Sequence, residues 1–141
     1  MRVLLDLNIL LDVFLAREPW LANSSAVLQS SFDGHISGCL SVASLPTIFY
    51  IVRRNANALR ASAVLKECLD SFELLRVERA TAESAFLMLG NDFEDNLQIS
   101  CAVEAGLDAI VTRDPRGFAL SPITVLTPAE LLARIADTPG A

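Results

Sequence analysis

The sequence contains few of the residues that mark several classes of protein. Its 141 residues include one lysine, one histidine, three cysteines, six glycines and six prolines. So few glycines and prolines exclude collagen-like and low-complexity chains, and a hydrophobic content of 52% excludes intrinsic disorder. No apolar run reaches the ~18 residues of a membrane span, because Asp6 and Asp12 interrupt the most apolar segment. We therefore expect one folded domain that does not cross a membrane.

The cysteines argue against a protein held together by disulfides. Cys39, Cys68 and Cys101 are odd in number, widely spaced and set among apolar residues, which is typical of buried free thiols in a reducing compartment. With one histidine and no CxxC pair, a structural zinc site is not expected either. No small-residue cleavage site follows Met1, so we expect no secretory signal and a cytoplasmic location.

The chain is acidic, with a formal net charge of −6. An acidic chain binds nucleic acid poorly in a sequence-independent way, because neutralising phosphates requires lysine and arginine. Any contact with nucleic acid would therefore need a local basic patch, a bound cation or a partner.

Short apolar runs alternate with helical periodicity, a pattern typical of an α/β fold with a mainly parallel sheet. The predicted strands cover residues 2–5, 35–39, 72–77, 109–112 and 123–126. The predicted helices cover residues 8–15, 19–32, 44–54, 59–71, 81–90 and 94–105, and a last one begins at Thr127-Pro128. Ser41 or Ser44 is expected to cap the third helix, Thr81 the fifth and Asp92 the sixth, and Gly106 to end the sixth. We expect a single domain over residues 1–137 and a frayed tail at 138–141.

Acidic residues stand at three junctions of this pattern. Asp6 follows the strand 2–5, Asp114 follows the strand 109–112, and Glu94 and Asp95 open the helix 94–105. Taken singly, each is more typical of a helix cap or an acidic first turn than of a functional site.

Taken together, these acids predict a metal site. The carboxyl ends of parallel strands share one edge of a sheet, so Asp6, Asp95 and Asp114 are expected to meet there. Clustered carboxylates repel one another and lose hydration, and only Arg113 is near in sequence to offset them. A hard cation such as Mg²⁺ or Mn²⁺ takes oxygen ligands, activates water and binds phosphoryl oxygens. The chemistry expected is phosphodiester hydrolysis.

Three segments carry a family resemblance. Residues 4–12 are LLDLNILLD, residues 92–98 are DFEDNLQ, and residues 109–118 are AIVTRDPRGF. In this order they resemble the PIN domain family, the nuclease domain of VapC-like toxins in type II toxin–antitoxin pairs, over about residues 2–135. The resemblance implies a PIN-like three-layer fold, with a parallel sheet of about five strands flanked by helices. It also implies Mg²⁺- or Mn²⁺-dependent cleavage of RNA, an antitoxin partner and a homodimer.

The resemblance assigns roles to individual residues. It implies that three aspartates hold the metal and act in catalysis, namely Asp6, Asp95 and Asp114. Residues that support the site would be Asn8, Glu94, Thr112 and Thr47. Arg113 and Arg116 would contact the RNA.

The chain departs from the family pattern at two positions. Many PIN domains have a glutamate on the helix after the second strand, where Thr47 stands, and an acid before the Phe of the last segment, where Gly117 stands. Fewer carboxylates imply weaker metal binding, or a metal shell that the substrate phosphate completes. One alternative is therefore a weakly active or inactive PIN-like binding module.

A further alternative is a phosphatase with Asp6 as the nucleophile. It is disfavoured because Asn8 cannot act as the general acid that a second aspartate supplies there. His35 is expected to be structural or exposed, because metal-activated water needs no histidine base. Trp20, Phe49 and Tyr50 are candidates for stacking on bases, although a core or dimer-interface role is favoured for aromatic residues at helical spacing.

Overall fold

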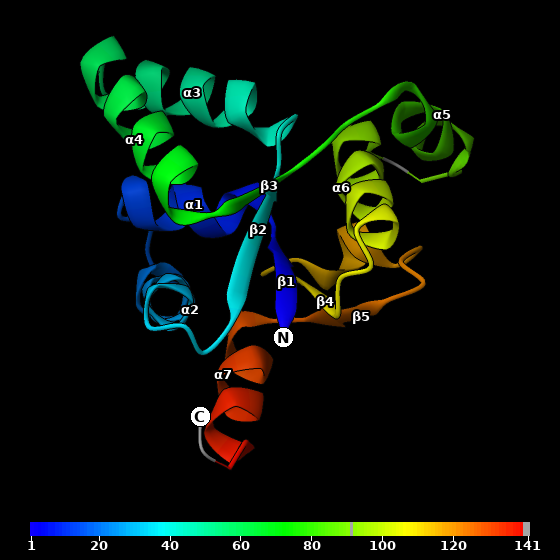
Figure 1. Cartoon of the computed structure of the whole chain (residues 1–141). Helices are drawn as coiled ribbons and strands as arrows, with labels where there is room; N and C mark the ends of the chain where they lie inside the picture. The colour runs from blue at the N-terminus through cyan, green and yellow to red at the C-terminus, as the bar shows by residue number, and fades with distance from the viewer. Residues whose placement is uncertain (91, 140–141) are drawn as a thin grey trace.

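The computed structural model describes residues 1–90 and 92–139. At its centre lies a parallel five-stranded sheet in the order β3-β2-β1-β4-β5 (Figure 1). The strands are β1 (Arg2–Leu5), β2 (Ser37–Ser41), β3 (Glu73–Leu75), β4 (Ala109–Val111) and β5 (Thr124–Leu126). The predicted α/β fold with a five-stranded parallel sheet is confirmed.

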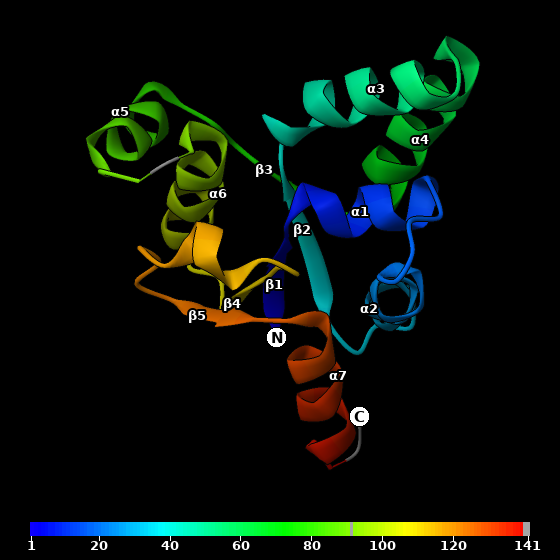
Figure 2. The ribbon, with the colours of Figure 1, turned by 180° about the vertical axis from the view of Figure 1, so that it is seen from behind.

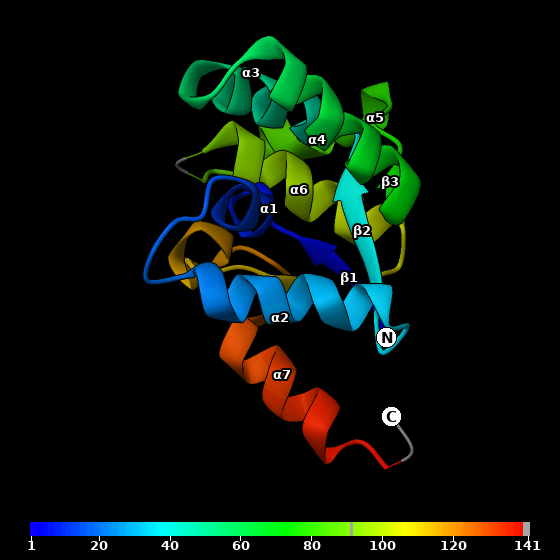
Figure 3. The ribbon, with the colours of Figure 1, turned by 90° about the vertical axis from the view of Figure 1, so that its left-hand side faces the viewer.

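Helices cover both faces of the sheet and make the three layers (Figures 1 and 2). One face is covered by α1 (Leu7–Phe14), α2 (Leu21–Phe32), α3 (Ser44–Asn55), α4 (Ala58–Ser71) and α7 (Pro128–Asp137). The other face is covered by α6 (Phe93–Glu104) and the short 3₁₀ helix η1 (Pro115–Phe118), with α5 (Arg79–Leu87) packed on α6. Figure 3 shows α2 and α7 on the first of these faces.

The alternation of side chains along each strand builds two separate cores. Val3 and Leu5 of β1 contribute to the core on the α1 side, whereas Leu4 packs with Ile99 and Phe118 on the α6 side. Successive residues of a strand point to opposite faces of a sheet. Because both faces are covered, residues 3–5 of β1 and all of β4 are apolar and buried, as is typical of parallel sheets.

Two predicted helix caps were wrong. Helix α3 begins after Ala43, and Ser44 is its first residue; Oγ of Ser41 instead accepts the N–H of Ala43 at 3.2 Å. Helix α5 has Glu78 at its N-cap, and Thr81 lies inside the first turn, where the two residues form a reciprocal capping box. In both cases the residue predicted as the cap lies close to the true N-cap. Ser44 comes one residue after Ala43, and Thr81 comes three residues after Glu78.

The second strand starts two residues later than predicted. The N–H groups of His35 and Ile36 donate to the carbonyl oxygen of Ser30 at 2.9 and 3.4 Å, so they close the end of α2 and do not join the sheet. The other strand and helix boundaries differ from the predictions by three residues or fewer.

Two smaller predictions are confirmed, namely the glycine that ends α6 and the buried free thiols. Gly106 follows α6 with a φ of +64°, a left-handed conformation that favours glycine. The three cysteines are buried free thiols. In the part of the chain described, no helix is long and apolar enough to span a membrane. At the C-terminus, Oγ1 of Thr138 donates to the carbonyl oxygen of Arg134 at 2.8 Å; the rest of the predicted tail includes residues 140–141, which lie outside the described residues.

The N-terminus and the end of α7 lie near the end of the sheet where β1 and β2 begin, since Met1, Ile36 and Ile135 line one cavity (Figure 1). The strands run in parallel, so their carboxyl ends meet at the opposite edge. That edge receives the starts of α1, α3 and η1, and it is where ligand sites form in open α/β sheets.

Candidate functional site

Asp6 lies directly after the central strand β1, at the N-cap position of α1. Its carboxylate does not cap the helix. Instead, Oδ1 accepts a hydrogen bond from Nε2 of Gln98 (3.2 Å), and Oδ2 accepts one from Oγ1 of Thr112 (2.9 Å). Only 4% of Asp6 is exposed. The side chain is therefore fixed by residues from α6 and from the end of β4, and the capping interpretation does not describe it.

Thr112 joins Asp6 to Asp114. The buried Thr112 hydroxyl donates to Asp6 and also accepts the backbone N–H of Asp114 at 3.0 Å. Asp114 occupies the N-cap position of η1, ahead of Pro115, but its exposed side chain makes no cap hydrogen bond. Two of the three acids predicted to bind metal thus stand at helix starts without capping them.

The start of α6 supplies the remaining acids. Asp92 caps this helix as predicted, because its Oδ1 accepts the N–H of Glu94 at 2.8 Å and that of Asp95 at 3.3 Å. Oγ1 of Thr47, on α3, donates to Oε2 of Glu94 at 3.0 Å. Where the family pattern has a glutamate on α3, this chain therefore has a threonine hydrogen-bonded to a glutamate of α6.

The pKa values indicate that these acids share one region. Burial first, and then repulsion from Asp92, Asp6, Glu94 and Asp114, raises the pKa of Asp95 to about 7. Burial is also the main cause of the raised pKa of Asp6 and of Glu94. Acids from three separate segments are thus close enough to disfavour one another's charge.

Gly117 makes room for Asp95. A Cβ atom at position 117 would lie 2.7 Å from Oδ2 of Asp95, closer than real Cβ contacts come. Arg116, which is exposed, lines a cavity of about 230 Å³ together with Asp92, Asp95 and Gly117. Gly117, which stands where many PIN domains have an acid, therefore leaves the space that the Asp95 carboxylate occupies.

Arg113 makes its ion pair with Asp12 and not with an acid of the site, although its charge acts to lower the pKa of Asp6. Its Nε donates to Oδ2 of Asp12 at 2.8 Å, and its guanidinium lies over the ring of Trp20, 3.8 Å from the ring centre. Within residues 1–90 and 92–139, Asp6, Glu94, Asp95 and Asp114 have no arginine or lysine partner within 4.0 Å. Asn8, predicted to support the site, accepts a long hydrogen bond from Nη1 of Arg17 (3.4 Å).

The donor set fits a hard divalent cation bound through few carboxylates. In the described part of the chain, no three acid, histidine or cysteine side chains form a ready-made metal cluster. Mg²⁺, however, is usually bound by one or two carboxylates, with waters and substrate phosphates completing its shell. The carboxylates of this site repel one another and have no ion pair with arginine or lysine in the described residues, which matches that mode of binding. Asp6 and Asp95 are the best candidates for ligands, because both are removed from water and near other acids.

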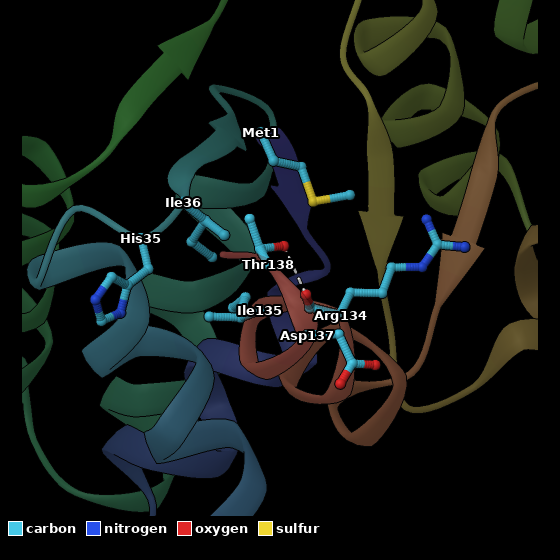
Figure 4. Close-up of a pocket in the computed structure, with 7 residues that line it drawn as sticks. All are labelled: Met1, His35, Ile36, Arg134, Ile135, Asp137 and Thr138. Atoms are coloured by element: carbon cyan, nitrogen blue, oxygen red, sulfur yellow. Dashed lines mark hydrogen bonds between the residues drawn. The ribbon is translucent and has the colours of Figure 1, made fainter. Parts of the chain in front are cut away.

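A cavity at the other end of the sheet shares none of these features. It has a volume of about 370 Å³ and is lined by Met1, His35, Ile36 and the end of α7 (Figure 4). His35 is exposed, as predicted, and precedes β2. It therefore lies at the amino end of the strands and is not in a position to serve the acids at the carboxyl edge.

Fold and site together describe an α/β protein with an acidic centre at the carboxyl edge of a parallel sheet. The model of the PIN domain family matches residues 2–116, so the chain belongs to the PIN domain family. The comparison with curated proteins found no match.

Solved structures with the same fold include toxin–antitoxin proteins. The chain is 13% identical to VapC20 of Mycobacterium tuberculosis, described as a sarcin–ricin loop cleaving toxin, with a TM-score of 0.71 over 84% of this chain and 94% of that one. It is 17% identical to a chain of the DNA-bound VapBC of Salmonella typhimurium (TM-score 0.68, covering 91% and 98%). It is 20% identical to a chain of a toxin–antitoxin complex from Klebsiella pneumoniae (TM-score 0.67, covering 89% and 97%). At these identities the likeness establishes the fold.

Sequence reasoning missed two residues that hold the site. Gln98 follows Asp95 by three positions, which places both on one face of α6, and that spacing was available as a signal. Asp12 was noted only as part of the N-terminal segment. Its burial and its ion pair with Arg113, 101 positions away, depend on the pairing of β1 with β4.

Proposed function

We propose that this protein is a metal-dependent endoribonuclease that hydrolyses phosphodiester bonds of RNA. The observation that carries the proposal is the group of carboxylates around Asp95, drawn from three segments, mutually repelling and without arginine or lysine partners in the described chain. Membership of the PIN domain family supports the same conclusion.

Asp6 and Asp95 would hold Mg²⁺ or Mn²⁺, and Asp114, whose side chain is exposed, would join them when the ion is bound. When bound, such an ion lowers the pKa of water and neutralises charge on a phosphoryl oxygen. The hydrogen bonds from Gln98 and Thr112 orient both oxygens of Asp6, so that this carboxylate does not have to be ordered when the ion binds.

The supporting residues keep the rest of the acidic centre in place. Thr47 fixes Glu94 through its hydroxyl, and Gly117 leaves the space that Asp95 occupies. Both positions that depart from the family pattern thus adjoin acids of α6 and remain part of the acidic centre, which favours an active enzyme over an inactive binding module. The phosphatase alternative loses support because the chain belongs to the PIN domain family.

RNA approaches this centre against an unfavourable charge. The chain carries −6 overall, and the phosphates of RNA are negative, so the bound cation and nearby arginines must supply the attraction. Arg116, exposed beside Asp95, is the candidate for direct phosphate contact. Arg113 is a weaker candidate for it, because its Nε is already bonded to Asp12.

The biological role that we propose is that of a toxin controlled by an antitoxin. Proteins with this fold are found in VapBC and other toxin–antitoxin complexes, which supports an antitoxin partner for this chain. We also propose that it forms a homodimer and acts in the cytoplasm, where its RNA substrates are found.

The proposal is tested by cleavage of RNA by the purified protein. We expect the wild type to cut RNA when Mg²⁺ or Mn²⁺ is added and to stop when a chelator is present. Asp6→Asn keeps the size of the side chain but removes its charge, and we expect it to lose activity by at least about a hundredfold. Asp137→Asn, an exposed change at the far end of α7, is the matched control and should cut normally. Equal cleavage by Asp6→Asn and wild type would reject the metal site.

A further inference from the structure

A small cavity that includes Arg113, the residue before Asp114, has a composition unlike that of the acidic centre. Its volume is about 150 Å³, and it lies between the start of α2, the segment after β4 and the start of α7. Its lining includes Pro19, Trp20, Asn23, Arg113 and Thr127. It contains a cation and no acid, whereas the cavity beside α6 contains Asp92 and Asp95.

Two flat groups form one wall of this cavity. The guanidinium of Arg113 is 3.8 Å from the centre of the Trp20 ring, and Trp20 remains 39% exposed. Aromatic rings and arginine planes are the surfaces on which unpaired bases stack in complexes with RNA. The exposed part of Trp20 and the guanidinium of Arg113 are therefore the surfaces of this cavity that suit a base.

Asp12 fixes the position of Arg113. Oδ2 of the fully buried Asp12 accepts the Nε hydrogen of Arg113 (2.8 Å) and a hydrogen bond from Oγ of Ser24 (3.3 Å). Ser24 is on α2 and itself lines the cavity. Arg113 is thus ordered before any ligand arrives, which lowers the entropic cost of binding there.

The remaining lining suits the edges of a base. Pro19 and Pro128 present apolar surface, and the side chains of Asn23 and Thr127 offer hydrogen-bond donors and acceptors. An apolar pocket with a few polar groups is typical of a small-ligand site. Because Arg113 directly precedes Asp114, the cavity adjoins the acidic centre along the chain.

We propose that this cavity is a subsite that receives a nucleobase of the RNA, stacked on the Trp20–Arg113 pair, next to the phosphodiester bond at the acidic centre. This inference rests on the proposed nuclease function. It gives Trp20 a role in substrate binding and makes Asp12 a positioning residue for Arg113.

The test uses the fact that Trp20 is the only tryptophan in the chain. Short single-stranded oligonucleotides of A, C, G or U are titrated into the wild type with Ca²⁺ in place of Mg²⁺ or Mn²⁺, so that a divalent cation is present while the RNA stays intact. We expect saturable quenching of the tryptophan fluorescence, and no quenching by ribose 5-phosphate, which has no base. The sequence that binds most tightly would identify the preferred base.

Binding of the same oligonucleotides, labelled and followed by fluorescence anisotropy, is then compared between variants. Trp20→Leu should weaken binding by roughly five- to one-hundredfold, the range for loss of one base–aromatic stack. Phe32→Leu, an exposed aromatic at the other end of α2, is the matched control and should bind as the wild type does. Thermal unfolding of each variant checks that it is folded.

The outcomes separate the subsite from the enzyme. RNA that fails to bind, RNA that binds without quenching, or normal binding by Trp20→Leu would overturn the subsite. The same holds if Trp20→Leu disturbs only the self-association of the protein, since the cavity would then serve a protein contact. Quenching by RNA that the protein never cleaves with Mg²⁺ or Mn²⁺ would support the subsite and reject the nuclease. Cleavage of RNA without quenching would support the nuclease and reject the subsite.

Discussion

Asp12 shows how much a single buried charge connects in this protein. Its side chain is shielded from water and lies near two arginines, Arg113 at 2.8 Å and Arg17 at 3.9 Å. Its Oδ1 lacks a hydrogen-bond partner within the described residues. A buried carboxylate survives only if nearby charges and donors replace its lost hydration, so Asp12 ties α1, α2 and the segment after β4 together.

We expect Asp12→Asn to lower the free energy of unfolding by about 1.5–3 kcal/mol, the range for hydrogen bonds to charged groups. The change leaves Arg113 without its anion in a partly buried position. Urea denaturation in metal-free buffer measures the effect. Asp70→Asn, which breaks an exposed pair with Lys66, is the control and should stay within about 0.5 kcal/mol of the wild type. Equal losses in the two variants would contradict the role assigned to Asp12.

Asp95 makes the stability of the metal-free protein depend on pH. The folded pKa of about 7 lies above the ordinary value of 3.8, so between these values the folded protein holds more protons than the unfolded chain. Stability must therefore fall as the pH rises through this window. We expect the unfolding temperature to fall accordingly and Asp95→Asn to flatten the dependence.

Asp95→Asn also distinguishes the repulsion between the acids from their binding of a metal ion. With Mg²⁺ added, the wild type should gain stability, and more so at high pH where the acids are charged. Asp95→Asn should gain less. If the pH dependence and the Mg²⁺ response of Asp95→Asn both equalled those of the wild type, Asp95 would have no part in the acidic centre.

At the scale of elements, the packing of η1 against α6 controls the position of Asp95. Both elements meet in the core around Ile99 and Phe118, and Gly117 brings the η1 backbone next to the Asp95 carboxylate. No left-handed φ is involved at Gly117, so only space requires glycine there.

Gly117→Ala should therefore cost activity and leave stability nearly unchanged. The added Cβ would displace the mobile end of Asp95, and a misplacement of this size costs on the order of a hundredfold in rate. Gly34→Ala is the opposite case, because Gly34 has a φ of +78° and open space around its Cβ position. It should lose about 1 kcal/mol of stability and keep its activity. RNA cleavage and thermal unfolding are measured for both variants. If each variant lost activity and stability to the same degree, the role assigned to Gly117 would be wrong.

The elements that the sequence predicted well are those with strong local signals. Apolar runs identified every strand, and Asp92 and Gly106 correctly marked the two ends of α6. The caps of α3 and α5 were missed because several polar residues near each start compete for the same position. Which of them caps depends on where the preceding chain enters, and that is set by the sheet.

For the whole molecule, the parallel sheet and its acidic edge were predictable because strand-end residues in parallel sheets meet at one edge. The partners of those acids were not. Arg113 was expected to offset the acids of the site, yet it pairs with Asp12, and Thr47 was a missing acid in the sequence but a partner of Glu94 in the fold. Such pairings join residues far apart in the chain and follow from the order of strands, which sequence patterns leave open.

The central place of β1 has a consequence for synthesis. Asp6 and its hydrogen-bond partner Thr112 are 106 positions apart, and β1 pairs with β4 in the finished sheet. The ribosome therefore has to make and release the chain from β1 through β4 before the acids can come together. Fragments that end before β4 lack Thr112 and Asp114, so they would not assemble the acidic centre.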